Sequence, residues 1–186
     1  MLLFVGLGNP TPDSENNRHN IGFKLIDTLN QKFNLSKQKP KFKGLLTTGN
    51  IEDRKVYAIK PLTFMNNSGI CIREVIEYFK IDAEDVIVFH DDLDIEFGKV
   101  KAKFAGSSAG HNGIESIDKF IGKDYSRVRI GIGRPKTKAD VSDHVLKDFD
   151  DDEMIQLEKI TSDIINSISI LIDKKLDLFS STVNNK

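Results

Sequence analysis

Two histidine–asparagine pairs are the residues of this chain whose types and spacing point most directly to chemistry. His19 and Asn20 lie in "NRHNIGF", and His111 and Asn112 lie in "AGHNG". A neutral histidine can accept a proton near neutral pH, and an asparagine amide offers a donor and an acceptor without charge. These types suit hydrolysis by an activated water. The first stretch by itself is also typical of a helix start, with Asn17 or Asn20 as the capping residue.

An acidic cluster follows a strongly apolar run. "HDDLD" comes directly after "DVIVF", so Asp91 lies nearest the end of a predicted buried strand. Asp91 could orient a histidine, or Asp91, Asp92 and Asp94 together could hold Mg²⁺ for phosphodiester chemistry. The second hypothesis predicts loss of activity in EDTA. His90 continues the strand pattern and is predicted to be a wall residue.

The glycines of "GLGNP" invite comparison with a phosphate-binding loop. Gly6 and Gly8 follow a predicted strand, but the third glycine of the dinucleotide fingerprint is replaced by Thr11, which a proline follows. No GxxxxGK[ST] motif, HExxH motif or paired CxxC motif occurs either. We therefore expect neither a cofactor nor a metal, and we expect the glycines to form a tight turn that presents Asn9.

The elements that would position these residues alternate along the chain. Apolar runs and alternating patterns predict strands at 2–7, 55–60, 85–90 and 127–133. Apolar residues at helical spacing predict helices over 21–33, 72–79, 114–120 and about 151–173. This order predicts one α/β domain over residues 1–186, a three-layer sandwich with a central mixed, mostly parallel, twisted sheet flanked by helices. The last residues, about 178–186, are predicted to fray.

The loops after these strands carry most of the polar candidates. In open α/β sheets the loops at the carboxyl ends of the strands form the functional crevice. Asn9 follows the first strand, "PLTFMNNSG" follows the second, "DDLD" follows the third, and "AGSSAGHNG" follows an extended segment around 97–104. We expect these loops to converge on a single site.

Basic residues alternate in two segments. Lys99, Lys101 and Lys103 alternate in "GKVKAKF", and Arg127 and Arg129 alternate in "RVRIGIG". In extended chain, side chains two residues apart project from the same face. Two such stripes beside a glycine-rich loop predict contacts with nucleic-acid phosphates, although solvated surface cations would give the same pattern.

The bulk composition limits the class of protein. The chain has 186 residues, of which 39% are hydrophobic and 30% charged, with a formal net charge of −1. No apolar run reaches the roughly 18 residues that a membrane span needs, and the opening residues do not form a secretory signal. We expect a soluble, cytoplasmic protein. The lone Cys71 lies among apolar residues at helical spacing and is predicted to be a packed thiol.

Taken together, the motifs resemble the bacterial peptidyl-tRNA hydrolase family. "GLGNP", "RHNIGF", "KPLTFMNNSG", "HDDLD", "AGHNG" and "RIGIGRP" occur in the family's order and cover nearly the whole chain. The resemblance implies a single-domain α/β enzyme that hydrolyses the ester between a peptide and the 3′ ribose of tRNA, and we expect the protein to be a monomer. The first loop departs from the family pattern, since Thr11 replaces a glycine and Ser14 stands near the place of a tyrosine.

The resemblance also implies roles for individual residues. His19, Asp91 and Asn112 would be catalytic. The residues implied in substrate binding are Asn9, Ser14, Phe64, Met65, Asn66, His111 and Asn112. The residues implied in tRNA binding are Lys101, Lys103, Arg127 and Arg129. A non-catalytic RNA-binding relative, of the kind that works in intron splicing in plant organelles, is the alternative; the presence of His19, Asp91 and the asparagines disfavours it.

Overall fold

A seven-stranded sheet forms the centre of the protein, whose computed structural model describes residues 1–186. The strand order is β2-β3-β4-β1-β5-β7-β6. The strands are β1 (Leu2–Gly6), β2 (Lys39–Lys41), β3 (Gly44–Ile51), β4 (Arg54–Pro61), β5 (Val86–Asp92), β6 (Val100–Phe104) and β7 (Ser126–Gly131). The helices are α1 (Ile21–Lys32), α2 (Ser68–Phe79), α3 (Asn112–Ile121), α4 (Val141–Leu146), α5 (Asp151–Asn166), α6 (Ile168–Ile172) and α7 (Leu176–Asn184).

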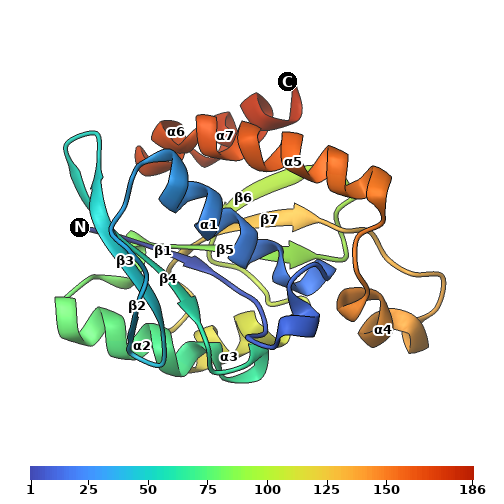
Figure 1. Ribbon diagram of the computed structural model, residues 1–186, viewed down its shortest axis with the longest axis horizontal. Helices are drawn as coiled ribbons and strands as arrows, with labels where there is room; N and C mark the ends of the chain where they lie inside the picture. The colour runs from blue at the N-terminus through green and yellow to red at the C-terminus, as the bar shows by residue number, and fades with distance from the viewer.

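Helices cover both faces of this sheet, which confirms the predicted three-layer α/β class. Helices α1, α5, α6 and α7 lie on one face, and α2 and α3 lie on the other (Figure 1). Strands β4, β1, β5 and β7 run parallel at the centre. Strands β2, β3 and β6 add antiparallel pairings at the two edges, so the sheet is mixed. The four predicted strands are all present in the parallel centre.

Each face of the sheet has its own apolar core. The cluster under α1 and α5 to α7 contains 25 buried residues, and the cluster under α2 and α3 contains 15. Every residue of β5 is buried. This explains why its sequence reads as one continuous apolar run up to the strand end, since both of its faces are covered. Cys71 lies in the smaller core, where burial raises the pKa of its thiol to about 12 and makes it a packed group.

Helix α1 lies unusually close to the end of β1. A Cβ atom on Gly6 would overlap the Gly22 carbonyl oxygen, and one on Gly8 would come within 2.8 Å of the Phe23 ring. Neither Gly6 nor Gly8 has a positive φ. No turn forms at residues 7–10, so the prediction that these glycines permit a tight turn is wrong: they permit close packing of α1, and the short turn Arg18–Asn20 before α1 lies against β5.

The C-terminal region differs from the sequence prediction. Residues about 178–186 are predicted to fray, but α7 is a helix that buries Phe179 completely and Val183 almost completely. The predicted helix over 151–173 divides into α5 and α6 at Ser167, which is buried. The acidic start of α5 is a capping box, which Asp150 and Glu153 form together.

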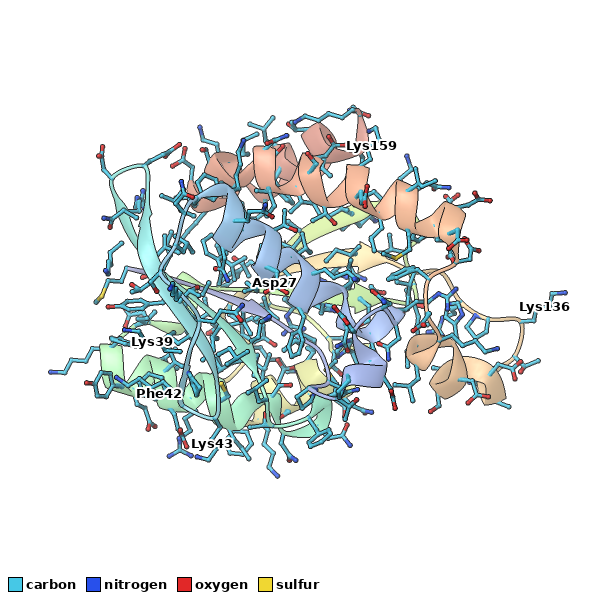
Figure 2. The ribbon with its side chains drawn as sticks, viewed as in Figure 1. Asp27, Lys39, Phe42, Lys43, Lys136 and Lys159 are labelled. Atoms are coloured by element: carbon cyan, nitrogen blue, oxygen red, sulfur yellow. The ribbon has the colours of Figure 1, made fainter.

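The two edge strands are protected in different ways. Strand β2 carries the exposed residues Lys39, Pro40 and Lys41, and charged residues and proline discourage pairing with another chain. Figure 2 shows Lys39, Phe42 and Lys43 around the hairpin that β2 forms with β3. The outer edge of β6 is covered by α7. The Asn184 side chain donates to the Val100 carbonyl and accepts from the Val100 amide, at 2.8 and 2.9 Å.

None of the helices combines the length and the apolar character needed to cross a membrane.

Candidate active site

A cleft of about 410 Å³ opens at the carboxyl ends of the parallel strands. Eight of the predicted catalytic and substrate-binding residues line it: Asn9, His19, Phe64, Met65, Asn66, Asp91, His111 and Asn112. They come from four separate loops, as the strand-end interpretation predicted. Helix α4 forms much of the apolar wall through Val141, Val145 and Leu146.

Asp91 lies at the centre of the polar groups and binds two histidines. His19 Nδ1 lies 2.9 Å from each of its carboxylate oxygens, and His111 Nε2 lies 2.8 Å from Oδ1. The Asp91 side chain is only 2% exposed. Two donors are needed here, because a buried carboxylate is costly unless it is paired and hydrogen-bonded.

The hydrogen bonds fix the tautomer of His111. Its Nδ1 accepts from the backbone amides of Gly113 and Ile114, at 3.1 and 3.3 Å, so it serves as the N-cap of α3. The proton must then lie on Nε2, which donates to Asp91. The sequence interpretation assigns His111 an orienting role and leaves Asn112 to face the ligand. This geometry agrees, since Asn112 begins α3 exposed at the cleft.

His19 is left with one nitrogen for chemistry. Its Nδ1 donates to Asp91, while Nε2 has no partner within the protein. Burial alone would lower the pKa of His19, but the charge of Asp91 and the hydrogen bond to it outweigh burial and raise that pKa above 6.5. Burial would raise the pKa of Asp91, yet His19 and His111 hold it far below its usual range. Asp91 is therefore a permanent anion beside a basic imidazole.

His90 forms a neutral wall behind these groups, as the sequence predicted. Its ring packs edge-on against His111, with centroids 4.9 Å apart, and its Nδ1 donates to the Asp91 carbonyl oxygen at 2.7 Å. Burial, His111 and Arg127 lower the pKa of His90 to about 3. His90 therefore carries no charge near neutral pH.

The three aspartates of "HDDLD" do not converge on one point. Asp92 binds Arg129 Nε through Oδ2 at 2.8 Å, and its Oδ1 accepts from the Asp94 amide. Asp94 pairs with Arg134. Ligand atoms of His19, Asp91 and His111 do lie within 4.8 Å of one another. A cation there would displace the hydrogen bonds that hold both rings, so the donor set favours proton chemistry over a Mg²⁺ site.

The loop of Asn9 is fixed from two sides. The Asn20 side chain donates to the Asn9 carbonyl and accepts from the Asn9 amide, both at 2.9 Å. Asn9 Oδ1 in turn accepts from the Met65 amide at 2.9 Å, which leaves the Asn9 NH₂ group free to donate. Asn17 and Asn20 do stand at the N-cap positions of Arg18–Asn20 and of α1, as the sequence predicted, but neither side chain makes a capping hydrogen bond. The anchoring role of Asn20 had no signal in the sequence beyond its amide.

Ser14 is the predicted substrate-binding residue that does not reach the cleft. It is buried, and its hydroxyl pairs with that of Thr11 at 2.7 Å. The two residues that depart from the family pattern therefore bind each other. Phe64, by contrast, stands on the rim, 54% exposed. Its φ of 60° is rare for a bulky residue and persists only where the surroundings impose it.

Helix α4 is a wall element that the sequence patterns did not predict. Arg18, the residue before His19, donates to the carbonyls of His144 and Lys147 and pairs with Glu153. These bonds hold α4 beside the turn that carries His19. The spacing of Val141, Val145 and Leu146 is the available signal, but one and a half turns of helix are too short to be recognised by periodicity.

The predicted basic stripes are only partly available to a ligand. Strand register pairs Lys101 with Arg129 and Lys103 with Arg127, so all four share one face as predicted. Lys101 and Lys103 are exposed, whereas the Arg129 side chain is 24% exposed and bound to Asp92. Arg127 is 2% exposed. Its assignment to tRNA binding is wrong, because a buried guanidinium cannot reach a phosphate. Lys136 points outward from the loop between β7 and α4 (Figure 2).

An open α/β sheet whose strand-end cleft holds a carboxylate-bound histidine defines an enzyme suited to hydrolysis through an activated water. Residues 3–186 match the peptidyl-tRNA hydrolase family. A peptidyl-tRNA hydrolase of Pelagibacter ubique is 93% identical over 186 residues, 100% of both chains. One of Ehrlichia canis is 43% identical over 183 residues, 98% of this chain and 94% of that one. The chain therefore belongs to the peptidyl-tRNA hydrolase family.

Solved structures give the same result. The crystal structure of a peptidyl-tRNA hydrolase from Acinetobacter baumannii matches with a TM-score of 0.93 at 34% identity, over 99% of this chain and 94% of that one. The match extends through the edge strands and α7. The fold expected from the sequence resemblance is thereby confirmed.

Proposed function

We propose that this chain hydrolyses the ester bond between the peptide and the 3′ ribose of peptidyl-tRNA and so returns free tRNA to translation. The observation that carries the proposal is the pairing of His19 with a buried, ionised Asp91 in a cleft lined by free amides. Membership of the peptidyl-tRNA hydrolase family supports the choice of substrate.

In the proposed mechanism His19 acts as the general base. Its Nε2 takes a proton from a water that attacks the ester carbonyl carbon, and Asp91 stabilises the imidazolium that forms. His19 then returns the proton to the departing ribose oxygen when the tetrahedral intermediate collapses. The bond to Asp91 keeps the proton on Nδ1, which leaves Nε2 as the basic nitrogen throughout.

The asparagines would supply neutral hydrogen bonds to the substrate. The Asn9 NH₂ group is the pre-oriented donor, since its partner oxygen is already bound to Met65, and it suits the developing oxyanion or a peptide carbonyl. Asn66 and Asn112 are exposed and can adapt to the peptide or the ribose. Phe64 and Met65 would form an apolar contact for the terminal nucleoside or the peptide side chain.

Binding of the tRNA would depend on cations of the edge strand β6 and its neighbour. Lys101 and Lys103 lie exposed on β6, and the partly exposed Arg129 lies opposite Lys101 on β7. Contacts of this kind go to phosphates and are largely independent of sequence. We further propose that the chain acts as a monomer in the cytoplasm, where ribosomes release peptidyl-tRNA.

Hydrolysis of an N-blocked aminoacyl-tRNA tests the proposal. We expect His19→Ala to lose roughly 10²- to 10⁴-fold in kcat, the range for loss of a general base, with little change in KM. Lys159→Ala, at an exposed position on α5, serves as a folded control with normal turnover. Near-wild-type kcat for His19→Ala would show that the mechanism is wrong.

Two further measurements separate the alternatives. The general-base mechanism predicts the same turnover before and after dialysis against EDTA, whereas a Mg²⁺-dependent phosphoesterase would stop. A non-catalytic RNA-binding relative would bind the N-blocked aminoacyl-tRNA without releasing the blocked amino acid. The release assay distinguishes that outcome directly.

A further inference from the structure

The guanidinium of Arg127 is buried and committed to contacts inside the protein. Its NH1 donates to the Ser107 carbonyl at 3.0 Å, and its NH2 donates to Asp118 Oδ1 at 2.9 Å. The guanidinium carbon lies 4.6 Å from the centroid of the Tyr125 ring. The Tyr125 hydroxyl donates to the same Asp118 oxygen at 2.7 Å. A buried charge is tolerated only with such partners.

The two contacts of Arg127 lie on either side of His111 in the sequence. Ser107 belongs to residues 105–110, which we call the cleft loop and which run directly into His111. Asp118 lies on α3, the helix that His111 caps. One side chain from the sheet therefore ties the segment before His111 to the helix after it.

The cleft loop needs such a tie because its backbone is unfavourable. Ala105, Gly106, Ala109 and Gly110 all have positive φ, at 57°, 104°, 48° and 80°. Two alanines in the left-handed region persist only where their surroundings hold them. Within the loop, the hydroxyls of Ser107 and Ser108 bind nearby amides. Arg127 makes the one side-chain hydrogen bond from the sheet to the loop's main chain.

We propose that Arg127 is a positioning residue for the catalytic pair: by holding Ser107 and Asp118 together it fixes His111, and through His111 the placement of Asp91 and His19. The path is continuous, since His111 Nε2 and His19 Nδ1 both donate to Asp91. Arginine donates here through two separate nitrogens held in one plane, and the single ammonium nitrogen of lysine cannot reproduce that geometry. The kinetic part of this inference rests on the proposed function.

Arg127→Lys is the central test because it keeps the charge and removes one arm of the fork. We expect faster hydrogen exchange in residues 105–112, measured on the free protein. We expect kcat for N-blocked aminoacyl-tRNA to fall roughly 10- to 10²-fold through misplacement of the reacting groups, with KM and its salt dependence unchanged. The acid limb of the kcat–pH profile should also move to higher pH. When His111 is held less firmly, its hydrogen bond to Asp91 weakens, so the Asp91 charge acts more strongly on His19 and raises the pKa of His19 further.

Two further variants keep the test decisive. Asp118→Asn removes the charge that anchors the guanidinium and should produce the same changes to a smaller degree, even if Arg127→Lys does not fold. Ile172→Val removes one methylene from the core under α6, away from the cleft, and serves as a control of reduced stability. It should show wild-type exchange in residues 105–112 and a wild-type pH profile.

The inference is overturned if Arg127→Lys and Asp118→Asn keep wild-type exchange in the cleft loop and a wild-type acid limb. It is equally overturned if Ile172→Val reproduces their loss of kcat, or if Arg127→Lys raises KM and flattens its salt dependence, which would mean direct contact with RNA. Failure of the proposed function looks different: the wild type would not release the blocked amino acid, while the exchange measurement would still report on the loop.

Discussion

Asp91 carries the charge on which the balance of protons in the cleft depends. It is shared between His19, whose pKa it raises, and His111, whose tautomer is fixed from the other side by the start of α3. The hydrogen bond from His111 to Asp91 thus limits how far the Asp91 charge raises the pKa of His19. The site needs both effects: an imidazole basic enough to take a proton from water, yet not so basic that it stays protonated.

Replacing Asp91 by asparagine tests this balance. The pKa of His19 is raised in the wild type, so its catalytic form is lost as the pH falls through a value above 6.5. In Asp91→Asn burial remains and the charge is gone, so the pKa of His19 should drop and the acid limb of kcat should move to lower pH. The plateau of kcat should fall roughly 10²- to 10⁴-fold. An acid limb that stayed in place would contradict the assignment; Asp163→Asn on α5 is the control.

His90 gives a prediction about stability instead of turnover. Its folded-state pKa of about 3 lies below the reference value of 6.5, so the unfolded chain takes up the proton first as the pH falls. The stabilisation is complete above pH 6.5 and is lost on acidification toward pH 3, by up to about 1.4 kcal/mol per pH unit. His90→Asn keeps a donor for the Asp91 carbonyl but cannot titrate. Urea unfolding should show the free energy of unfolding of the wild type falling relative to this variant across that interval. Parallel curves would contradict it.

Among the elements, α7 stabilises more of the protein than its position in the sequence suggested. It fills the larger core with Phe179 and supplies hydrogen bonds to β6 from Asn184 and from Ser180, whose hydroxyl accepts from the Ala102 amide at 2.9 Å. Leu176, Phe179 and Val183 do follow helical spacing, so a signal existed. It was too short to outweigh the polar residues around it.

Two substitutions on α7 measure its contribution. Phe179→Ala should lower the free energy of unfolding by about 3–5 kcal/mol, the usual cost of removing a buried phenylalanine. Leu178→Ala, on the same helix but half exposed, should change it by less than about 0.5 kcal/mol. Chemical denaturation checks both. Equal, small effects would mean that α7 is loosely attached.

For the whole molecule, the distribution of charge matters more than its sum. A formal net charge of −1 suggests no affinity for RNA, yet Lys101 and Lys103 stand exposed on the edge strand β6, opposite Arg129 and Arg127 of β7. Asp92 and Asp118, the carboxylates paired with the neighbouring β7 arginines, are neutralised inside the protein, since Asp92 binds Arg129 and Asp118 binds Arg127. The lysines therefore face solvent without competing partners of their own.

Replacing these two lysines by alanine should raise KM for peptidyl-tRNA and leave kcat unchanged. For each phosphate that is no longer bound, the slope of log KM against log salt should decrease by about one. Lys159→Ala, on a helix covering the opposite face of the sheet (Figure 2), should leave both parameters unchanged. An unchanged salt slope in the double variant would reduce Lys101 and Lys103 to ordinary surface residues.

The sequence allowed the parallel centre of the fold and most of the cleft to be predicted, because both leave local patterns. Strand β5 is continuously apolar because both faces are buried, and the cleft residues follow strand ends. Other features depend on partners that are distant in the chain. Arg127 is buried because Asp118 pairs with its charge and Tyr125 packs against it, and Ser14 turns inward because Thr11 binds it. Strand β3, which alternates poorly, is defined by its pairing with β4.

The cover that α7 gives to β6 also sets an order of events during synthesis. Strand β6 joins the sheet through β7, which ends at Gly131, whereas the covering residues Ser180 and Asn184 leave the ribosome about 50 residues later. At synthesis rates of about 5–20 residues per second, the edge of the sheet stays open for several seconds. During that interval the backbone of β6 is free to pair with another nascent chain. Once folded, helix α7 therefore ends the period in which β6 can pair with a wrong strand, in addition to covering the edge of the finished sheet.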